Sequence, residues 1–265
     1  MITSYAAGAD FWAANRAFLE TNPYLSVFFK LDFPLLVAAD KVNYALRCEQ
    51  GEKALLALKV EPYNLLWFGD AECAPELLDF IMTGGYELKN YLCESHLGDT
   101  LAELLQARCA VRYEEALAMD FMEATQETEP SSPDVVRATE DDLDEIFECA
   151  KRFVVDCGLL DSISRERLKK SLSTFRLIHE NGHIASMASL SPGTDADIRI
   201  GYVYTPNAYR GRGYARKVVN SLKNEILASG KIATLNVDRK NPISNHLYSS
   251  LGFKRVFSQG EYRKC

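Results

Sequence analysis

The chain has 265 residues, of which 47% are hydrophobic, a composition typical of a globular protein with room for two domains. Its formal net charge of −7 is uneven: residues 1–133 carry an acidic excess, whereas residues 134–265 carry a basic excess. An acidic first half argues against nucleic acid as a partner, while a basic second half suits a polyanionic ligand.

Other classes are disfavoured by what the sequence lacks. No run of about 18 uncharged apolar residues is present, so we expect no membrane partner. The start, residues 1–6, lacks a basic flank before an apolar core and so does not resemble a signal peptide. The seven cysteines are odd in number and form no C-x-x-C, which argues against a disulfide framework and a metal site. We therefore expect a protein of the reducing cytoplasm that binds no metal.

The first half reads as an α/β domain over residues 1–123. Hydrophobic spacing predicts helices over residues 11–19, 75–82 and 99–107. Strands are expected over residues 42–47, 54–60, 91–92 and 111–121. Residues 124–133 are polar and contain Pro130 and Pro133, so they are interpreted as a linker.

The second domain is expected over residues 134–265. Thr139 is a good N-cap for a helix. Three acidic residues follow it in the first turn, where negative charge is favoured. Asn181-Gly182 predicts a hairpin turn. Helices are expected over 143–150, 165–172, 218–227 and 244–251, and strands over 135–136, 175–179, 183–190, 197–204, 232–237 and 253–257. This order predicts a mixed sheet flanked by helices.

The most informative stretch follows the strand over 197–204. It reads Arg210-Gly211-Arg212-Gly213-Tyr214-Ala215-Arg216 and opens a helix. Glycines let backbone N–H groups approach an anion, the helix N-terminus favours negative charge, and arginines add donors. The pattern predicts a phosphate cradle, against the alternative of an ordinary turn with solvent-facing arginines.

A second element comes about 30 residues later. Asn241 ends a strand, Tyr248 lies on the following helix, and Gly252-Phe253 opens the last strand. Taken singly, Asn241 reads as an N-cap and Tyr248 as a half-buried aromatic residue.

Together the two motifs resemble the acetyl-CoA site of the GNAT superfamily, the amine N-acetyltransferases, over roughly residues 134–265. The resemblance implies the GNAT fold, a twisted mixed sheet flanked by helices, here with an additional N-terminal α/β domain. It also implies acetyl-CoA as co-substrate. Backbone groups of Val203, Tyr204 and Thr205 would flank the acetyl group and pantetheine, and residues 210–216 would hold the pyrophosphate. Pro206 stands one place earlier than in many members, which changes the entry to the turn.

The resemblance further implies direct attack of a primary amine on the thioester. Asn241 would bond the pantetheine amide, and Tyr248 would protonate the leaving thiolate. Candidates for a base are Glu180, His179, His183 and Asp197, each of which also reads as a solvated or strand-end residue. Cys157 and Cys265 read as ordinary thiols rather than nucleophiles.

The first half carries no such loop. Residues 46–54 resemble residues 177–185, since both place Glu-x-Gly in a hairpin turn. We hypothesise a degenerate GNAT-like copy that shapes the acceptor site, although chance similarity of two hairpins remains open.

The sequence therefore favours an acetyl-CoA-dependent N-acetyltransferase acting on a small-molecule or peptide amine, and it allows a homodimer. The alternatives are an acyltransferase using another acyl-CoA and a non-catalytic CoA-binding sensor or regulatory module.

Overall fold

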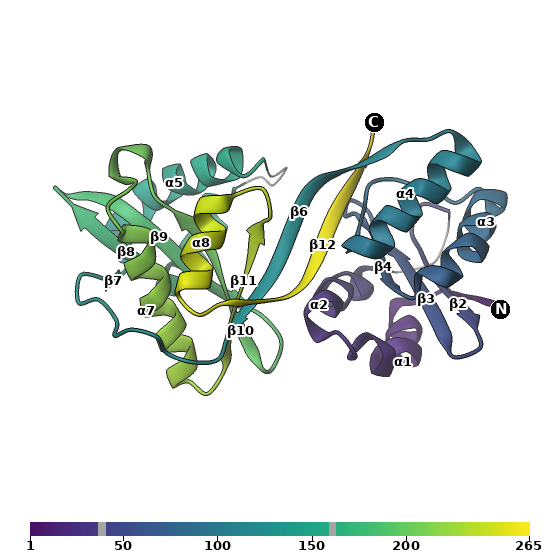
Figure 1. Ribbon diagram of the computed structural model, residues 1–265, viewed down its shortest axis with the longest axis horizontal. Coiled ribbons are helices and arrows are strands. Elements are labelled where there is room, and N and C mark those ends of the chain that lie inside the picture. The colour runs from purple at the N-terminus through teal and green to yellow at the C-terminus, as the bar shows by residue number, and fades with distance from the viewer. Residues whose placement is uncertain (37–40, 159–162) are drawn as a thin grey trace. The chain divides into compact units, whose positions relative to one another are not determined.

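The computed structural model describes residues 1–36, 41–158 and 163–265, which form two compact units (Figure 1). The first unit comprises Met1–Asp120, Asp238–Lys240 and Phe257–Cys265, and the second comprises Phe121–Val237 and Asn241–Val256. The expected domain boundary near residue 123 lies close to this division. The last residues of the chain, however, pack in the first unit rather than the second.

The first unit is a mixed sheet with helices on both faces. Its helices are α1 (Gly8–Leu19), α2 (Pro23–Asp32), α3 (Ala74–Gly84) and α4 (Ser95–Cys109), with short 3-10 turns at Phe33–Leu35 and Ala71–Cys73. Its strands are β1 (Ile2–Tyr5), β2 (Tyr44–Gln50), β3 (Lys53–Lys59), β4 (Leu65–Gly69), β5 (Tyr91–Glu94), most of β6 (Tyr113–Ala124) and most of β12 (Lys254–Lys264). The strand order is β1-β2-β3-β4-β5-β12-β6, with β4 and β5 parallel.

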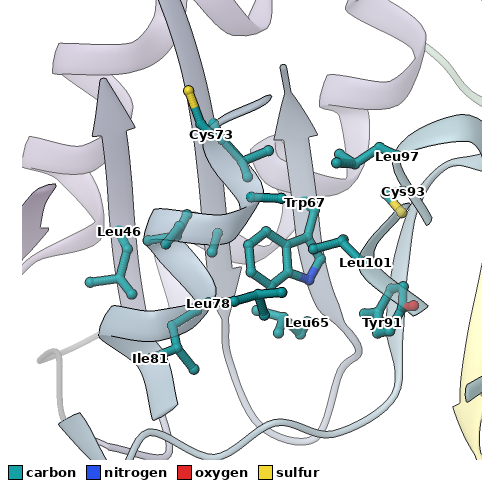
Figure 2. Close-up of a cluster of buried hydrophobic side chains, with 14 of the residues drawn as sticks. Leu46, Leu65, Trp67, Cys73, Leu78, Ile81, Tyr91, Cys93, Leu97 and Leu101 are labelled. Atoms are coloured by element: carbon teal, nitrogen blue, oxygen red, sulfur yellow. The ribbon is translucent and has the colours of Figure 1, made fainter. Parts of the chain in front are cut away.

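Two hydrophobic clusters form the core of this unit, one on each face of the sheet. Successive side chains of a strand alternate between faces, so Trp67 and Phe68 of β4 enter different clusters. Trp67 packs with Leu78 of α3 and Leu101 of α4 (Figure 2). On the other face, Phe68 packs with residues of α1 and α2, including Phe29, whose ring centroid lies 6.0 Å from its own.

The second unit repeats this arrangement. Its helices are α5 (Leu143–Asp156), α6 (Arg165–Lys170), α7 (Tyr214–Ala228) and α8 (Pro242–Ser250), with 3-10 turns at Glu140–Asp142, Leu172–Thr174 and Asn207–Tyr209. Its strands are β7 (Val136–Arg137), β8 (Phe175–Glu180), β9 (His183–Pro192), β10 (Asp197–Tyr204), β11 (Ile232–Asp238) and the end of β6. The order is β6-β11-β10-β9-β8-β7, with β10 and β11 parallel.

Local sequence signals account for several boundaries in this unit. Asn181 and Gly182 adopt positive φ angles of 53° and 79°, and they join β8 to β9 as the predicted hairpin. Thr139 and Asp142 form a capping box before α5, which confirms the predicted helix start.

Each half of the chain has the same order of elements: strand, two helices, three strands, helix, strand, helix, strand. The first repeat runs from β1 to β6 and the second from β7 to β12. The order expected for the second half is confirmed, and the first half has it too. The final strands are exchanged between the two repeats. β12, which ends the second repeat, pairs with β5 of the first unit, and β6, which ends the first repeat, neighbours β11. Each sheet is therefore completed by a strand from the other repeat.

The segment expected to be a linker is an ordered part of the second unit. Asn220 and Asn224 of α7 both donate side-chain hydrogen bonds to the Glu129 carbonyl, at 3.1 and 2.8 Å. Lys223 Nζ donates to Thr128 Oγ1 at 2.7 Å. Residues 128–130 are thus held against α7 rather than spanning freely between the units.

Candidate active site

The central strands of the second unit part at one end. β10 and β11 pair from Asp197–Ile232 to Ile200–Leu235, and the described pairing stops there. Beyond it the register of β10 against β9 shifts between Gly201 and Tyr204, and Tyr202 adopts a φ of 49°. A bulge of this kind re-aims the backbone and ends regular pairing. The backbone of residues 201–204 therefore lies outside the ladder with β11; this place, where the two strands are no longer paired, is called the gap below.

The glycine loop follows β10 and opens α7. Gly211 and Gly213 have φ angles of 77° and 79°, and a Cβ at either position would meet nothing within 4 Å. Gly213 is the N-cap of α7 and supplies no side-chain cap. The N–H groups of the first helical turn have no partner within the helix and favour an external anion. The loop thus leaves room for an anion at the start of α7, and the phosphate cradle stays a prediction.

The arginines of this loop are already paired. Each donates a hydrogen bond to a carboxylate elsewhere in the unit. The partners are Asp156 for Arg210 at 2.9 Å, Glu180 for Arg212 at 2.9 Å and Glu129 for Arg216 at 2.8 Å. They fasten the loop to α5, to the β8–β9 hairpin and to the 124–133 segment. The backbone amides of the loop are therefore the donors that a bound phosphate would use. The arginines would act on it as nearby positive charges.

Three residues lie where β10 leaves the sheet. Val203 packs against the cluster under α7, whereas Tyr204 packs in the cluster on the opposite face. Thr205 Oγ1 lies 2.9 Å from Ser186 Oγ, and its carbonyl accepts from Arg210 Nε at 2.9 Å. The end of β10 is thus anchored to β9 and to the loop, which holds the gap open.

Tyr248 lies on α8 and is only 6% exposed. Its ring packs edge to face with Phe253, at a centroid distance of 6.1 Å. Burial raises the pKa of the Tyr248 hydroxyl, so the group keeps its proton at neutral pH. The hydroxyl makes no hydrogen bond with the part of the chain that the structure describes.

Asn241 caps α8. Its Oδ1 accepts from Ser244 N at 3.1 Å, as the simpler interpretation of this residue predicts. The cap uses the acceptor of the side-chain amide and leaves its Nδ2 as a donor, so capping does not conflict with a bond to a ligand carbonyl.

The base candidates are engaged in other contacts. Glu180 accepts from Arg212 and from the Tyr214 hydroxyl, the latter at 2.9 Å. His179 Nε2 lies 2.8 Å from Asp142 Oδ1, and His183 Nδ1 lies 3.4 Å from Glu145 Oε1. None of these three is left without a partner in the described chain.

Asp197 is a structural carboxylate and does not fit the role of base. It is buried at the start of β10, the end away from the loop. It accepts from Thr194 N and from Thr234 Oγ1, both at 2.6 Å. A carboxylate so bonded fixes the turn before β10 and the β10–β11 pair.

The corresponding place in the first unit has the opposite charge. β4 and β5 also pair only over Leu65–Tyr91 and Leu66–Leu92. The loop between β4 and α3 lines a pocket of about 600 Å³ whose acidic residues are Asp70, Glu72 and Glu94. Carboxylates at this position repel phosphate. The first unit therefore has the topology of the second without its anion-binding chemistry.

Comparison with known proteins supports the same fold. Residues 194–263 match the family of FR47-like proteins. An acetyltransferase of the GNAT family from Colwellia psychrerythraea is 13% identical, with a TM-score of 0.64 over 99% of this chain and 100% of that one. A GCN5-related N-acetyltransferase from Sphaerobacter thermophilus is 15% identical, with a TM-score of 0.64 over 99% of this chain and 95% of that one. No curated protein matches the chain.

These structural similarities extend over both units, so the repeated architecture is shared with the two structures. Across residues 1–36, 41–158 and 163–265, no helix has both the length and the apolar character needed to cross a membrane. Among the same residues, no group of three or more His, Cys, Asp or Glu side chains is arranged to hold a metal ion.

Proposed function

We propose that the chain, whose fold is that of GNAT acetyltransferases, is a member of the GNAT superfamily and an N-acetyltransferase. It transfers the acetyl group of acetyl-CoA to a primary amine by direct attack. The observation that carries the proposal is the gap between β10 and β11 beside the glycine loop. That arrangement offers a slot for an extended ligand and a cradle for its phosphates.

The second unit would hold acetyl-CoA at three points. The N–H groups of residues 211–216 bind the pyrophosphate. The positive charges of Arg210, Arg212 and Arg216 stabilise its negative charge. The backbone of Val203, Tyr204 and Thr205 flanks the pantetheine and the acetyl group. Asn241 Nδ2 donates to a pantetheine carbonyl. A free N–H of the bulged β10 backbone would meet the oxyanion that develops on the thioester carbonyl.

The chemistry then needs one proton donor. The amine nitrogen bonds to the thioester carbon, the carbon–sulfur bond breaks, and the thiolate leaves with the electron pair. Tyr248, which is protonated at neutral pH, donates its proton to the thiolate. The amine loses its proton to solvent, since Glu180, His179 and His183 are held by other partners.

Gly213→Asp tests the cradle. It places a carboxylate among the amides that bind the pyrophosphate, and we expect acetyl-CoA affinity to fall about 100-fold, the loss of two charge-assisted hydrogen bonds. The matched control is Gly230→Asp, after the other end of α7. Gly230 has a φ of 78° and also has nothing within 4 Å of an added Cβ.

Isothermal calorimetry with acetyl-CoA measures both variants. The control should bind as the wild type does, because it carries the same substitution away from the site. Equal affinity of Gly213→Asp and Gly230→Asp in folded protein would contradict the assignment. Tight binding without turnover on any amine would instead favour a CoA-binding sensor.

A further inference from the structure

A polar patch lies on the sheet face opposite α7, beside the gap. Ile198 and Ile200 of β10 pack in the cluster with α7, so the alternation of the strand puts Arg199 on the other face. Arg199 pairs in register with Thr234 of β11. Asn236 follows Thr234 by two residues, so it lies on the same face. It comes after Leu235, whose pair with Ile200 is the last of the register. Arg199 and Asn236 thus line one face at the point where the strands part.

The Arg199 side chain makes no hydrogen bond with the residues that the structure describes. Its Nε is buried without a hydrogen bond, and no ion pair involves it among the described residues. Its nearest favourable contact is the ring of Phe121, 5.3 Å from the guanidinium carbon. Burial lowers the pKa of Arg199, and the charge of Asp197, itself bound by threonines, offsets this only in part. The side chain is half-buried, and a buried donor such as its Nε is normally paired, so we take this guanidinium as available to a ligand.

Asn236 supplies the complementary group. Its Oδ1 is buried and accepts no hydrogen bond. The pair therefore offers an unused cationic donor and, closer to the gap, an unused neutral acceptor. Arg176, a buried arginine of this unit, shows the usual situation, since it donates to both carboxylate oxygens of Glu225 at 2.9 and 2.5 Å.

Resting on the acetyl transfer proposed above, we propose that the acceptor is an amino acid. Its carboxylate binds the Arg199 guanidinium, and its amine donates to Asn236 Oδ1, which directs the nitrogen lone pair toward the thioester in the gap. The nitrogen bonds to the acetyl carbon, the carbon–sulfur bond breaks, and the products are an N-acetylamino acid and CoA. The proton lost by nitrogen goes to solvent, and the thiolate takes its proton from Tyr248.

The test compares amino acids with their amides, which keep the amine and lose the carboxylate charge. Glycine, alanine, serine and glutamate are each paired with the corresponding α-amide, and thiol release from acetyl-CoA gives kcat/KM. Wild-type protein should prefer at least one acid over its amide by about 100-fold, because a site built for a group rejects an analogue lacking it. Arg199→Met should abolish that preference by lowering kcat/KM for the acid to the value for its amide.

Thermal unfolding separates binding from a structural role. Arg199→Met removes a half-buried charge that has no ion pair among the described residues, so its Tm should equal or exceed that of the wild type. Arg176→Met breaks an existing buried ion pair, so it should lower the Tm and leave the preference for acids intact. Asn236→Asp puts a carboxylate beside Arg199, so it should raise the Tm and reduce use of acids.

Three results would overturn the proposal: acids and amides used equally, a preference that survives Arg199→Met, or amines acetylated while no acid is. Calorimetric titration with the same acids in the presence of CoA decides the point even without turnover, since no heat of binding would also refute it. Failure of acetyl-CoA itself to bind would refute the proposed function instead, so the two failures are distinguishable.

Discussion

Tyr248 is a buried residue whose polar atom has no use in the fold. Its ring contributes to the core beneath α7, while its hydroxyl makes no hydrogen bond in the described chain. Tyr248→Phe should therefore leave the Tm and the affinity for acetyl-CoA unchanged. It should lower kcat by about 10²- to 10⁴-fold, because the proton donor acts only in the transition state. Steady-state kinetics with a good acceptor amine and calorimetry with acetyl-CoA measure the two effects.

Tyr262 provides the contrasting substitution. Its buried hydroxyl donates to Ser95 carbonyl oxygen at 2.9 Å and lies 2.7 Å from Asp99 Oδ1. Tyr262→Phe should lower the stability by about 1–2 kcal/mol, since it leaves buried acceptors unpaired, without a specific loss of kcat. If Tyr248→Phe lost stability rather than turnover, Tyr248 would be a packing residue.

At the level of elements, the sequence predicted those whose signals are local. The Asn181-Gly182 turn, the Thr139 cap and the β10–loop–α7 order each depend on residues close in the chain. β4 was not anticipated, because Leu65–Gly69 is buried on both faces and lacks the alternation of a half-exposed strand. The strand β1 was missed because it is short, and α2 because its composition is apolar without a clear polar face.

The site divides in the same way. Gly211, Gly213, Asn241 and Tyr248 are recognisable by motif, and their roles stay predictions. The gap itself depends on a bulge at Tyr202 and on the register of three strands, which local patterns do not encode. Arg199 was missed for a related reason. A charge between two isoleucines is visible in sequence, but its lack of a partner is a tertiary property.

At the scale of the whole molecule, the exchange of terminal strands makes each unit depend on residues from both halves of the sequence. A fragment of residues 134–265 would keep β12 without β5, and it would lose Met122 and Ala124 from the core of the second unit. Residues 1–133 would lose Tyr262 from the core of the first. Each fragment alone would expose an unpaired sheet edge and a depleted core.

We therefore expect neither fragment to unfold cooperatively when purified alone, and the two to copurify when coexpressed. Circular dichroism during thermal unfolding and size-exclusion chromatography provide the measurements. A fragment of residues 134–265 that melts cooperatively and binds acetyl-CoA with the affinity of the whole chain would show that the exchanged strands are dispensable.

The central claim is that acetyl-CoA binds between β10 and β11, with its phosphates at the start of α7. Hydrogen exchange of backbone amides, followed by mass spectrometry with and without acetyl-CoA, tests it most directly. We predict slower exchange at residues 203–205 and 211–216, and no change at residues 69–78, the corresponding loop and helix start of the first unit. Protection at residues 69–78 instead, or no protection at residues 211–216 under saturating acetyl-CoA, would contradict the assignment.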